Sequence, residues 1–177
     1  LERWGQALLA HSRSPLDAVH YWAARVAYSN HIQQPGQGVD EFIRGARLLG
    51  ASFPRNPSVP DILRAFMGLQ LTLATRGQLD PVAAPLMTDP KALALMDLIR
   101  SACMPAFVAS PNLIAMLAFT ITSLTVRRGV APVSGWGVGA YGFVLLGPFG
   151  MIARGLRLAD AARVLQARVG DTERARA

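Results

Sequence analysis

The chain has 177 residues, about the size of one domain. Hydrophobic residues make up 51% of it and charged residues only 16%, which excludes intrinsic disorder because disorder requires low hydrophobicity and high charge. One cysteine, Cys103, excludes a disulfide scaffold and a cysteine-rich zinc site. The first residue is Leu1 and no signal-peptide pattern follows it, so we expect a cytoplasmic segment of a longer protein.

The net charge of +7 comes almost entirely from arginine, since Lys91 is the single lysine. A basic chain attracts nucleic acid when its charges gather on one face and aromatic side chains lie among them. Here aromatic residues amount to 7% and do not alternate with the arginines. The pattern favours solvated helix faces, and we do not expect a nucleic-acid partner.

Helix signals dominate the chain from end to end. Proline near the start and glycine after the last turn delimit most of the segments, as at Pro15, Pro60, Gly50, Gly77 and Gly129. Pro105 is expected to end or kink its helix. The predicted helices cover residues 15–34, 39–49, 60–76, 90–105, 111–128, 133–146 and 151–169. Asp40 and Glu41 fall in the first turn of the second helix, where a negative charge complements the helix dipole.

These signals predict an all-α fold of about eight antiparallel helices. Helix, turn and helix recur at residues 16–49 and again at 133–169, and such pairs stack into α-solenoids. We therefore expect one irregular solenoid domain over residues 1–177, with a possible internal linker at 80–85. The charged tail after residue 169 is expected to fray.

Two apolar windows, residues 104–126 and 129–153, contain no charged side chain. Each is long enough to cross a bilayer, so a membrane-associated helical hairpin remains an alternative. Pro111 and Asn112 shorten the first window, and glycine and proline dilute the second. Amphipathic stripes elsewhere indicate water-facing surfaces, so a membrane location is possible but not favoured.

Residues 137–142 (GVGAYG) match the dinucleotide-binding pattern G-x-G-x-x-G. That pattern requires a preceding strand, and residues 130–134 form a poor one. We instead expect Gly135, Gly139 and Gly142 to lie near one helix face and permit close helix packing, with Tyr141 beside them.

The remaining candidates for chemistry are isolated. The histidines His11, His20 and His31 include no pair four residues apart that would place two metal ligands on one helix face. Cys103 has no companion signature and lies on an apolar stripe. The sequence therefore predicts no catalytic, cofactor-binding or metal-binding residue, and no cofactor.

Three stretches together resemble a known family. They are residues 38–50 (GVDEFIRGARLLG) with Phe53-Pro54 and Pro57, residues 85–96 (PLMTDPKALALM), and the series Pro105-Ala106-Phe107, Ser110-Pro111-Asn112-Leu113, Arg128-Gly129, Ser134 and Ala140-Tyr141-Gly142. These residues, in this order, are similar to the tetratricopeptide-like helical region of bacterial multidomain signalling proteins with a STAND-type predicted ATPase. In those proteins a Ser/Thr kinase domain often precedes the ATPase, and GAF, histidine-kinase or cyclase domains often follow the helices. The turn at residues 147–150 departs from the family pattern.

The resemblance implies a non-enzymatic scaffold that relays conformational state between flanking domains of the same chain, with other proteins as further candidate partners. The family's ATP and kinase sites lie outside such a segment, so no functional residue carries over. A second alternative is a small-molecule-binding helical domain. Its apolar pocket would be lined by residues 136–149 together with Phe107 and Phe119.

Overall fold

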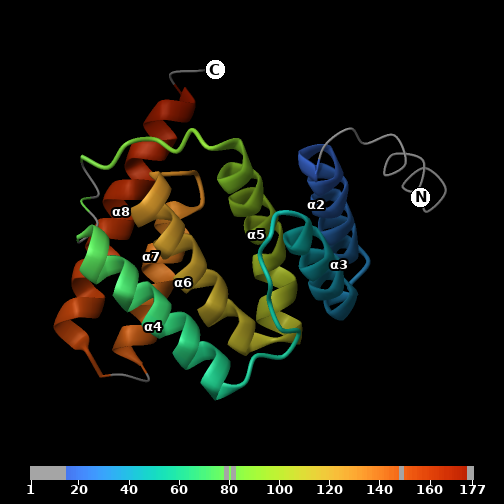
Figure 1. Cartoon of the computed structure of the whole chain (residues 1–177), viewed down its shortest axis with the longest axis horizontal. Coiled ribbons are helices and arrows are strands. Elements are labelled where there is room, and N and C mark those ends of the chain that lie inside the picture. The colour runs from blue at the N-terminus through green and yellow to red at the C-terminus, as the bar shows by residue number, and fades with distance from the viewer. Residues whose placement is uncertain (1–14, 78–79, 81–82, 148–149, 175–177) are drawn as a thin grey trace. The chain divides into compact units, whose positions relative to one another are not determined.

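The structure is a computed structural model that describes residues 15–77, 80, 83–147 and 150–174. Within these residues it contains seven α-helices and no β-strand, which confirms the all-α class. The helices are α2 (Pro15–His31), α3 (Pro35–Leu48), α4 (Val59–Arg76), α5 (Pro90–Ala109), α6 (Pro111–Arg128), α7 (Ser134–Leu146) and α8 (Ile152–Arg174), as Figure 1 shows. His11 and part of the predicted linker, residues 81–82, lie outside the described residues.

Glycine ends three helices where the sequence predicts it. Gly50, Gly77 and Gly129 have φ angles of 78°, 84° and 108°, a region that side chains with a Cβ rarely adopt. Their placement confirms the predicted ends of α3, α4 and α6. The helix α8, in contrast, continues to Arg174, beyond the predicted end at residue 169.

The predicted start of α3 is wrong. Pro35 occupies the first turn of α3, where its missing N–H costs no hydrogen bond. The helix therefore begins four residues before residue 39, and Asp40 and Glu41 lie beyond its first turn. They are not dipole partners; each forms an ion pair with an arginine instead.

Pro105 is expected to end or kink its helix, and the first of these alternatives is wrong, because α5 continues through this residue to Ala109. A proline in a helix leaves the carbonyl four residues earlier without its N–H donor. Here that carbonyl belongs to Ser101, and Asn30 Nδ2 donates to it at 3.4 Å. The buried Pro105 ring lies against Gly38 of α3, so packing holds the helix together at its weakest position.

The described helices belong to two compact units that interleave along the sequence. Unit 1 comprises Leu1–Ser58 and Pro90–Ile114, and unit 2 comprises Val59–Asp89 and Ala115–Ala177. The boundary after Ile114 falls inside α6. The described residues of the predicted linker, Asp80 and 83–85, belong to unit 2.

In unit 1, α2, α3 and α5 pack against one another (Figure 1). Val26, Phe42 and Ile99 are completely buried in this unit. Gly45 allows close approach, because a Cβ on it would lie 2.8 Å from Trp22 Cβ and 2.9 Å from Leu98 Cδ2. Substitution at Gly45 would therefore force α3 away from both neighbours.

In unit 2, α7 packs along α8. One core cluster consists of Leu69, Phe119, Tyr141 and Leu145, and a second consists of Val130, Val138, Leu165 and Val169. The segment before α5 is held to the end of α6 by backbone hydrogen bonds from Met87 N–H to Val130 O (2.8 Å) and from Val130 N–H to Pro85 O (2.7 Å). Gly129 fits beneath this segment because a Cβ there would lie 2.6 Å from the Pro85 carbonyl oxygen.

Neither apolar window forms one continuous helix. Residues 104–126 pass from α5 to α6, and residues 129–153 are divided by the end of α7. Among the described residues, α5 is the one helix whose length and composition would let it cross a membrane. Part of α5 is buried against α2 and α3, as the core helix of a soluble protein also would be.

Candidate functional site

A concave site lies in unit 2, among α4, α6, α7 and α8. It is a cleft with a volume of about 520 Å³, within the range usual for small-molecule sites. Its apolar wall includes Leu73 and Leu158. Its polar side chains are Gln70, Thr122, Tyr141, Arg154 and Arg157.

Three of these polar groups form a chain whose hydrogen-bond directions are fixed by chemistry. Arg154 Nη2 lies 3.0 Å from Gln70 Oε1, and Gln70 Nε2 lies 2.8 Å from the Tyr141 hydroxyl oxygen. Because a guanidinium cannot accept a hydrogen bond, the oxygen of the Gln70 amide must face Arg154. The amide nitrogen then faces Tyr141 and donates to it. The hydroxyl hydrogen of Tyr141 is therefore available to a further acceptor.

The cleft has a positive electrostatic character. Arg154 and Arg157 both line it, and neither forms an ion pair with an acidic side chain among the described residues. Thr122 donates its hydroxyl hydrogen to the Ala118 carbonyl at 2.8 Å, so this side chain presents only an acceptor. Hydrogen-bond donors and positive charge thus lie beside an apolar wall.

The four packing candidates lie on the same helix, α7. A Cβ on Gly135 would lie 3.0 Å from Ala162 O, and one on Gly142 would lie 3.0 Å from Gly155 O, so both face α8 closely. Gly139 has more room, with Ala162 Cβ at 3.4 Å. Tyr141 belongs to the core cluster with Leu69 and Phe119.

Sequence reasoning missed the tightest glycine of this helix. A Cβ on Gly137 would overlap Ile121 of α6. In the sequence Gly137 belongs to the pattern G-x-G-x-x-G. That pattern lies wholly inside α7, with no described strand before it. A glycine that packs against a second helix has the same local sequence pattern as a glycine of a dinucleotide-binding turn. Local sequence therefore cannot tell the two apart.

Ser134, which belongs to the resemblance pattern, ties the start of α7 to α6. Its hydroxyl oxygen accepts from Ala131 N–H at 2.9 Å and lies 2.8 Å from Thr125 Oγ1. Because Thr125 donates its hydrogen to Ile121 O, Ser134 must be the donor between the two hydroxyls. The role of Ser134 visible here is structural.

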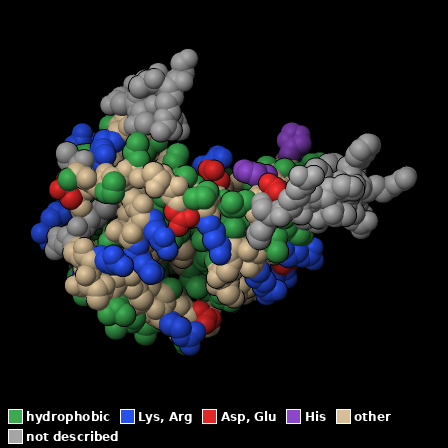
Figure 2. Space-filling model, turned by 45° about the horizontal axis from the view of Figure 1, so that its top comes forward, with side chains coloured by type: hydrophobic (Ala, Val, Ile, Leu, Met, Phe, Trp, Pro, Cys, Tyr) green, Lys and Arg blue, Asp and Glu red, His purple; other side chains and the backbone are tan. Residues whose placement is uncertain are grey.

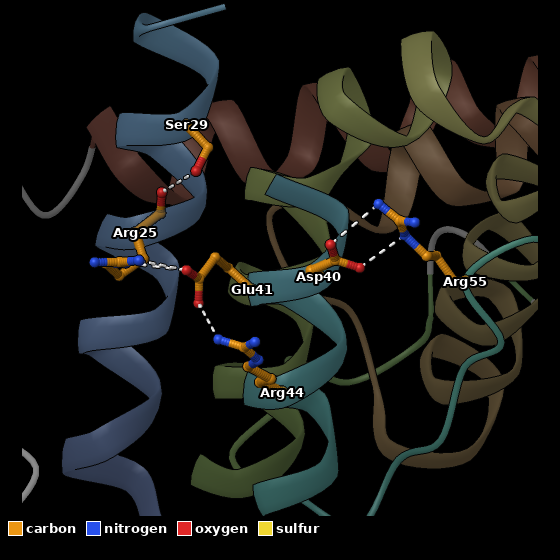
Figure 3. A network of polar contacts seen from close by, with 6 residues as sticks. All are labelled: Arg25, Ser29, Asp40, Glu41, Arg44 and Arg55. Atoms are coloured by element: carbon orange, nitrogen blue, oxygen red, sulfur yellow. Dashed lines mark hydrogen bonds and ion pairs between the residues drawn. The ribbon is translucent and has the colours of Figure 1, made fainter. Parts of the chain in front are cut away.

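A second polar cluster lies in unit 1 (Figure 3). Arg25 of α2 donates to Glu41 Oε1 of α3 through Nη2 at 2.5 Å and through Nε at 3.2 Å. Glu41 Oε2 accepts no hydrogen bond within the described part of the chain, although Arg44 Nη1 lies 3.8 Å away. On the other side of α3, Asp40 pairs with Arg55 at 2.8 Å. With every carboxylate paired to arginine, this cluster joins α2, α3 and the following loop.

One helix face in unit 2 is apolar and exposed. Val59, Leu63, Met67 and Leu71 follow one another at intervals of four residues along α4, and each is 51–73% exposed. We call these four residues the α4 apolar face. None of them lines the cleft. On the face of the protein shown in Figure 2, Lys and Arg side chains form several separate groups rather than one continuous patch.

The other sequence candidates remain scattered. His20 and His31 are exposed on α2. Burial raises the pKa of the Cys103 thiol to about 12, so this thiol is a poor nucleophile. No three metal-ligating side chains gather anywhere in the described ranges. Of the aromatic residues expected to line an apolar pocket, only Tyr141 lines the cleft among those described, whereas Phe119 is buried in the core.

Comparison with known proteins adds no relative. The sequence matches no protein-family model, no curated protein and no solved structure.

Proposed function

We propose that this chain is a non-enzymatic helical scaffold in a multidomain signalling protein of the cytoplasm. Its partners would be flanking domains of the same protein, between which it relays conformational state. The observation that carries the proposal is the α4 apolar face. The sequence resemblance to the tetratricopeptide-like region of STAND-type ATPase proteins supports the same role.

The α4 apolar face has the pattern of a surface made for another helix. Apolar side chains at a spacing of four residues form one stripe along a helix, and helix-in-groove recognition uses such stripes. Isolated exposed apolar residues are ordinary on protein surfaces, but four in register are a continuous patch. We infer that an amphipathic helix of a flanking domain covers this patch. The net charge of +7 favours a partner whose rim is acidic.

The proposed mechanism is helix-pair stacking in an irregular tetratricopeptide-like solenoid. Consecutive helices pack in pairs at α2 with α3 and at α7 with α8, which supports this arrangement. Each pair in a solenoid contacts only its neighbours, so a change in one pair-to-pair angle passes along the stack. The boundary between units falls inside α6, which makes that helix the proposed link for such a change.

The solvent accessibility of the α4 apolar face in the full-length protein tests the proposal. In a Cys103→Ser background, Met67→Cys and the control Ala167→Cys each place one thiol at an exposed helix position. Maleimide labelling of position 67 should be at least tenfold slower in the full-length protein than in the 177-residue chain, and position 167 should be unchanged.

Equal labelling of position 67 in both proteins would contradict the proposal, as would a reading frame that adds no domain at either end. Protection of position 67 in the 177-residue chain by phosphatidylcholine vesicles would favour the membrane alternative instead.

A further inference from the structure

We propose that the cleft in unit 2 binds a small organic molecule that ends in an oxyanion and has an apolar body. The inference goes beyond the scaffold role and does not depend on it, because no residue of the α4 apolar face lines the cleft. It rests on three features of the cleft: an available buried donor, unpaired positive charge and an adjacent apolar wall.

The first feature is the hydroxyl group of Tyr141. Its side chain is fully buried and its oxygen already accepts from Gln70 Nε2. Its hydroxyl hydrogen has no acceptor among the described residues, and Tyr141 is one of the residues that line the cleft. A buried donor without an acceptor is unfavourable, so an acceptor atom of a ligand would stabilise it.

The second feature is the pair of guanidinium groups. Gln70 holds Arg154 through one N–H, which orients the side chain, and no acidic side chain of the described residues pairs with it. Arg157 lies one turn further along α8 and also lines the cleft. Arginine forms charge-assisted hydrogen bonds with carboxylate and other oxyanions. The donors in this cleft thus favour an anion over a cation or a neutral group.

The third feature is the apolar wall. Leu73 of α4 and Leu158 of α8 line the cleft without being fully buried. Contact with a hydrocarbon body would remove their exposed surface from water, which favours binding. An inorganic anion would leave this wall uncovered. The expected ligand therefore combines an anionic end with an apolar chain or ring.

Calorimetric titration of the 177-residue chain with octanoate tests this inference. We expect saturable binding of one equivalent with a dissociation constant on the order of 0.1–1 mM, as ten non-hydrogen atoms allow. Octan-1-ol, which has the same body without the charge, should bind at least tenfold more weakly. Acetate, which has the charge without the apolar body, should also bind at least tenfold more weakly than octanoate.

Substitutions of single residues test whether octanoate binds in the cleft. Arg154→Met and Tyr141→Phe should each weaken octanoate binding, the former at least tenfold. Arg163→Met removes an exposed arginine of the same helix outside the cleft and should leave binding unchanged. Thermal melting in the absence of octanoate shows whether each variant is folded, and Arg157→Met replaces Arg154→Met if the latter is not.

Three outcomes would overturn the inference: no saturable octanoate binding at 10 mM, octan-1-ol binding as tightly as octanoate, or equal weakening by Arg163→Met and Arg154→Met. The labelling of Met67→Cys does not involve the cleft. Failure of the scaffold proposal can therefore be distinguished from failure of the ligand-binding proposal.

Discussion

Asn30 of α2 donates a hydrogen bond to the carbonyl oxygen of Ser101, the one oxygen of α5 that Pro105 deprives of its usual donor. A side chain from one helix thereby completes the backbone of another. The sequence separation of 71 residues makes this relationship invisible to any local pattern. It also explains how a helix with an internal proline remains continuous.

This relationship predicts an energetic coupling between Asn30 and Pro105. Asn30→Ala should lower the free energy of unfolding by about 1 kcal/mol, the usual net value of one hydrogen bond. In a Pro105→Ala background the new N–H satisfies Ser101, so the same substitution should cost close to nothing. Urea unfolding of the four proteins in a double-mutant cycle measures the coupling. Equal losses in both backgrounds would show that Asn30 does not complete α5.

The two adjacent carboxylates of α3 should differ greatly in their contribution to stability. Glu41→Ala removes the buried carboxylate that pairs with Arg25, whose side chain is only 16% exposed, and should cost about 3 kcal/mol. Asp40→Ala breaks the Arg55 pair, in which both side chains are exposed, and should cost at most about 1 kcal/mol. Chemical denaturation of both variants compares them directly. A larger loss for Asp40→Ala would contradict the burial of the Arg25–Glu41 pair.

Alanine should have opposite effects at two helical glycines. At Gly137 the new Cβ would overlap Ile121, and overpacking of this kind costs about 1–3 kcal/mol. A Cβ on Gly68 would meet no other part of the described chain within 4 Å, so Gly68→Ala should stabilise α4 by roughly 0.5–1 kcal/mol. Melting temperatures of the two variants should therefore move in opposite directions. A stabilised Gly137→Ala protein would mean that α6 and α7 are further apart than described.

The thiol of Cys103 should destabilise the protein at alkaline pH. Burial raises its pKa from 9.0 to about 12, so above pH 9 the unfolded chain loses a proton that the folded chain keeps. Stability is unaffected by this group below pH 9 and falls between pH 9 and 12, by up to about 1.4 kcal/mol per pH unit. Cys103→Ser should show a shallower fall in urea midpoint over this window. Identical pH profiles would indicate that the thiol is solvated.

Much of the helical content could be predicted because its signals are local. Gly50, Gly77 and Gly129 end helices through a backbone conformation that glycine alone adopts readily, and Pro90 and Pro111 begin helices through a fixed φ angle. The start of α3 could not be predicted, because a proline that follows one helix can also occupy the first turn of the next.

The cleft could not be predicted because its parts are far apart in the sequence. Gln70 and Tyr141 are separated by 71 residues, and Gln70 and Arg154 by 84. The sequence indicated a packing role for Tyr141 and gave no separate role to Arg154. A partly buried glutamine on an amphipathic helix gives no signal of its own, and only the assembled unit shows which polar groups meet.

The interleaving of the two units also constrains how this protein is made and divided. The chain enters unit 2 at Val59, leaves it at Pro90 and returns at Ala115, so no single cut can separate the units. During synthesis from the N-terminus, α4 emerges well before Phe119 and Tyr141, against which its buried side packs. For that interval both sides of α4 are apolar and uncovered, so a nascent chain that stalls before α7 is a natural client for a chaperone.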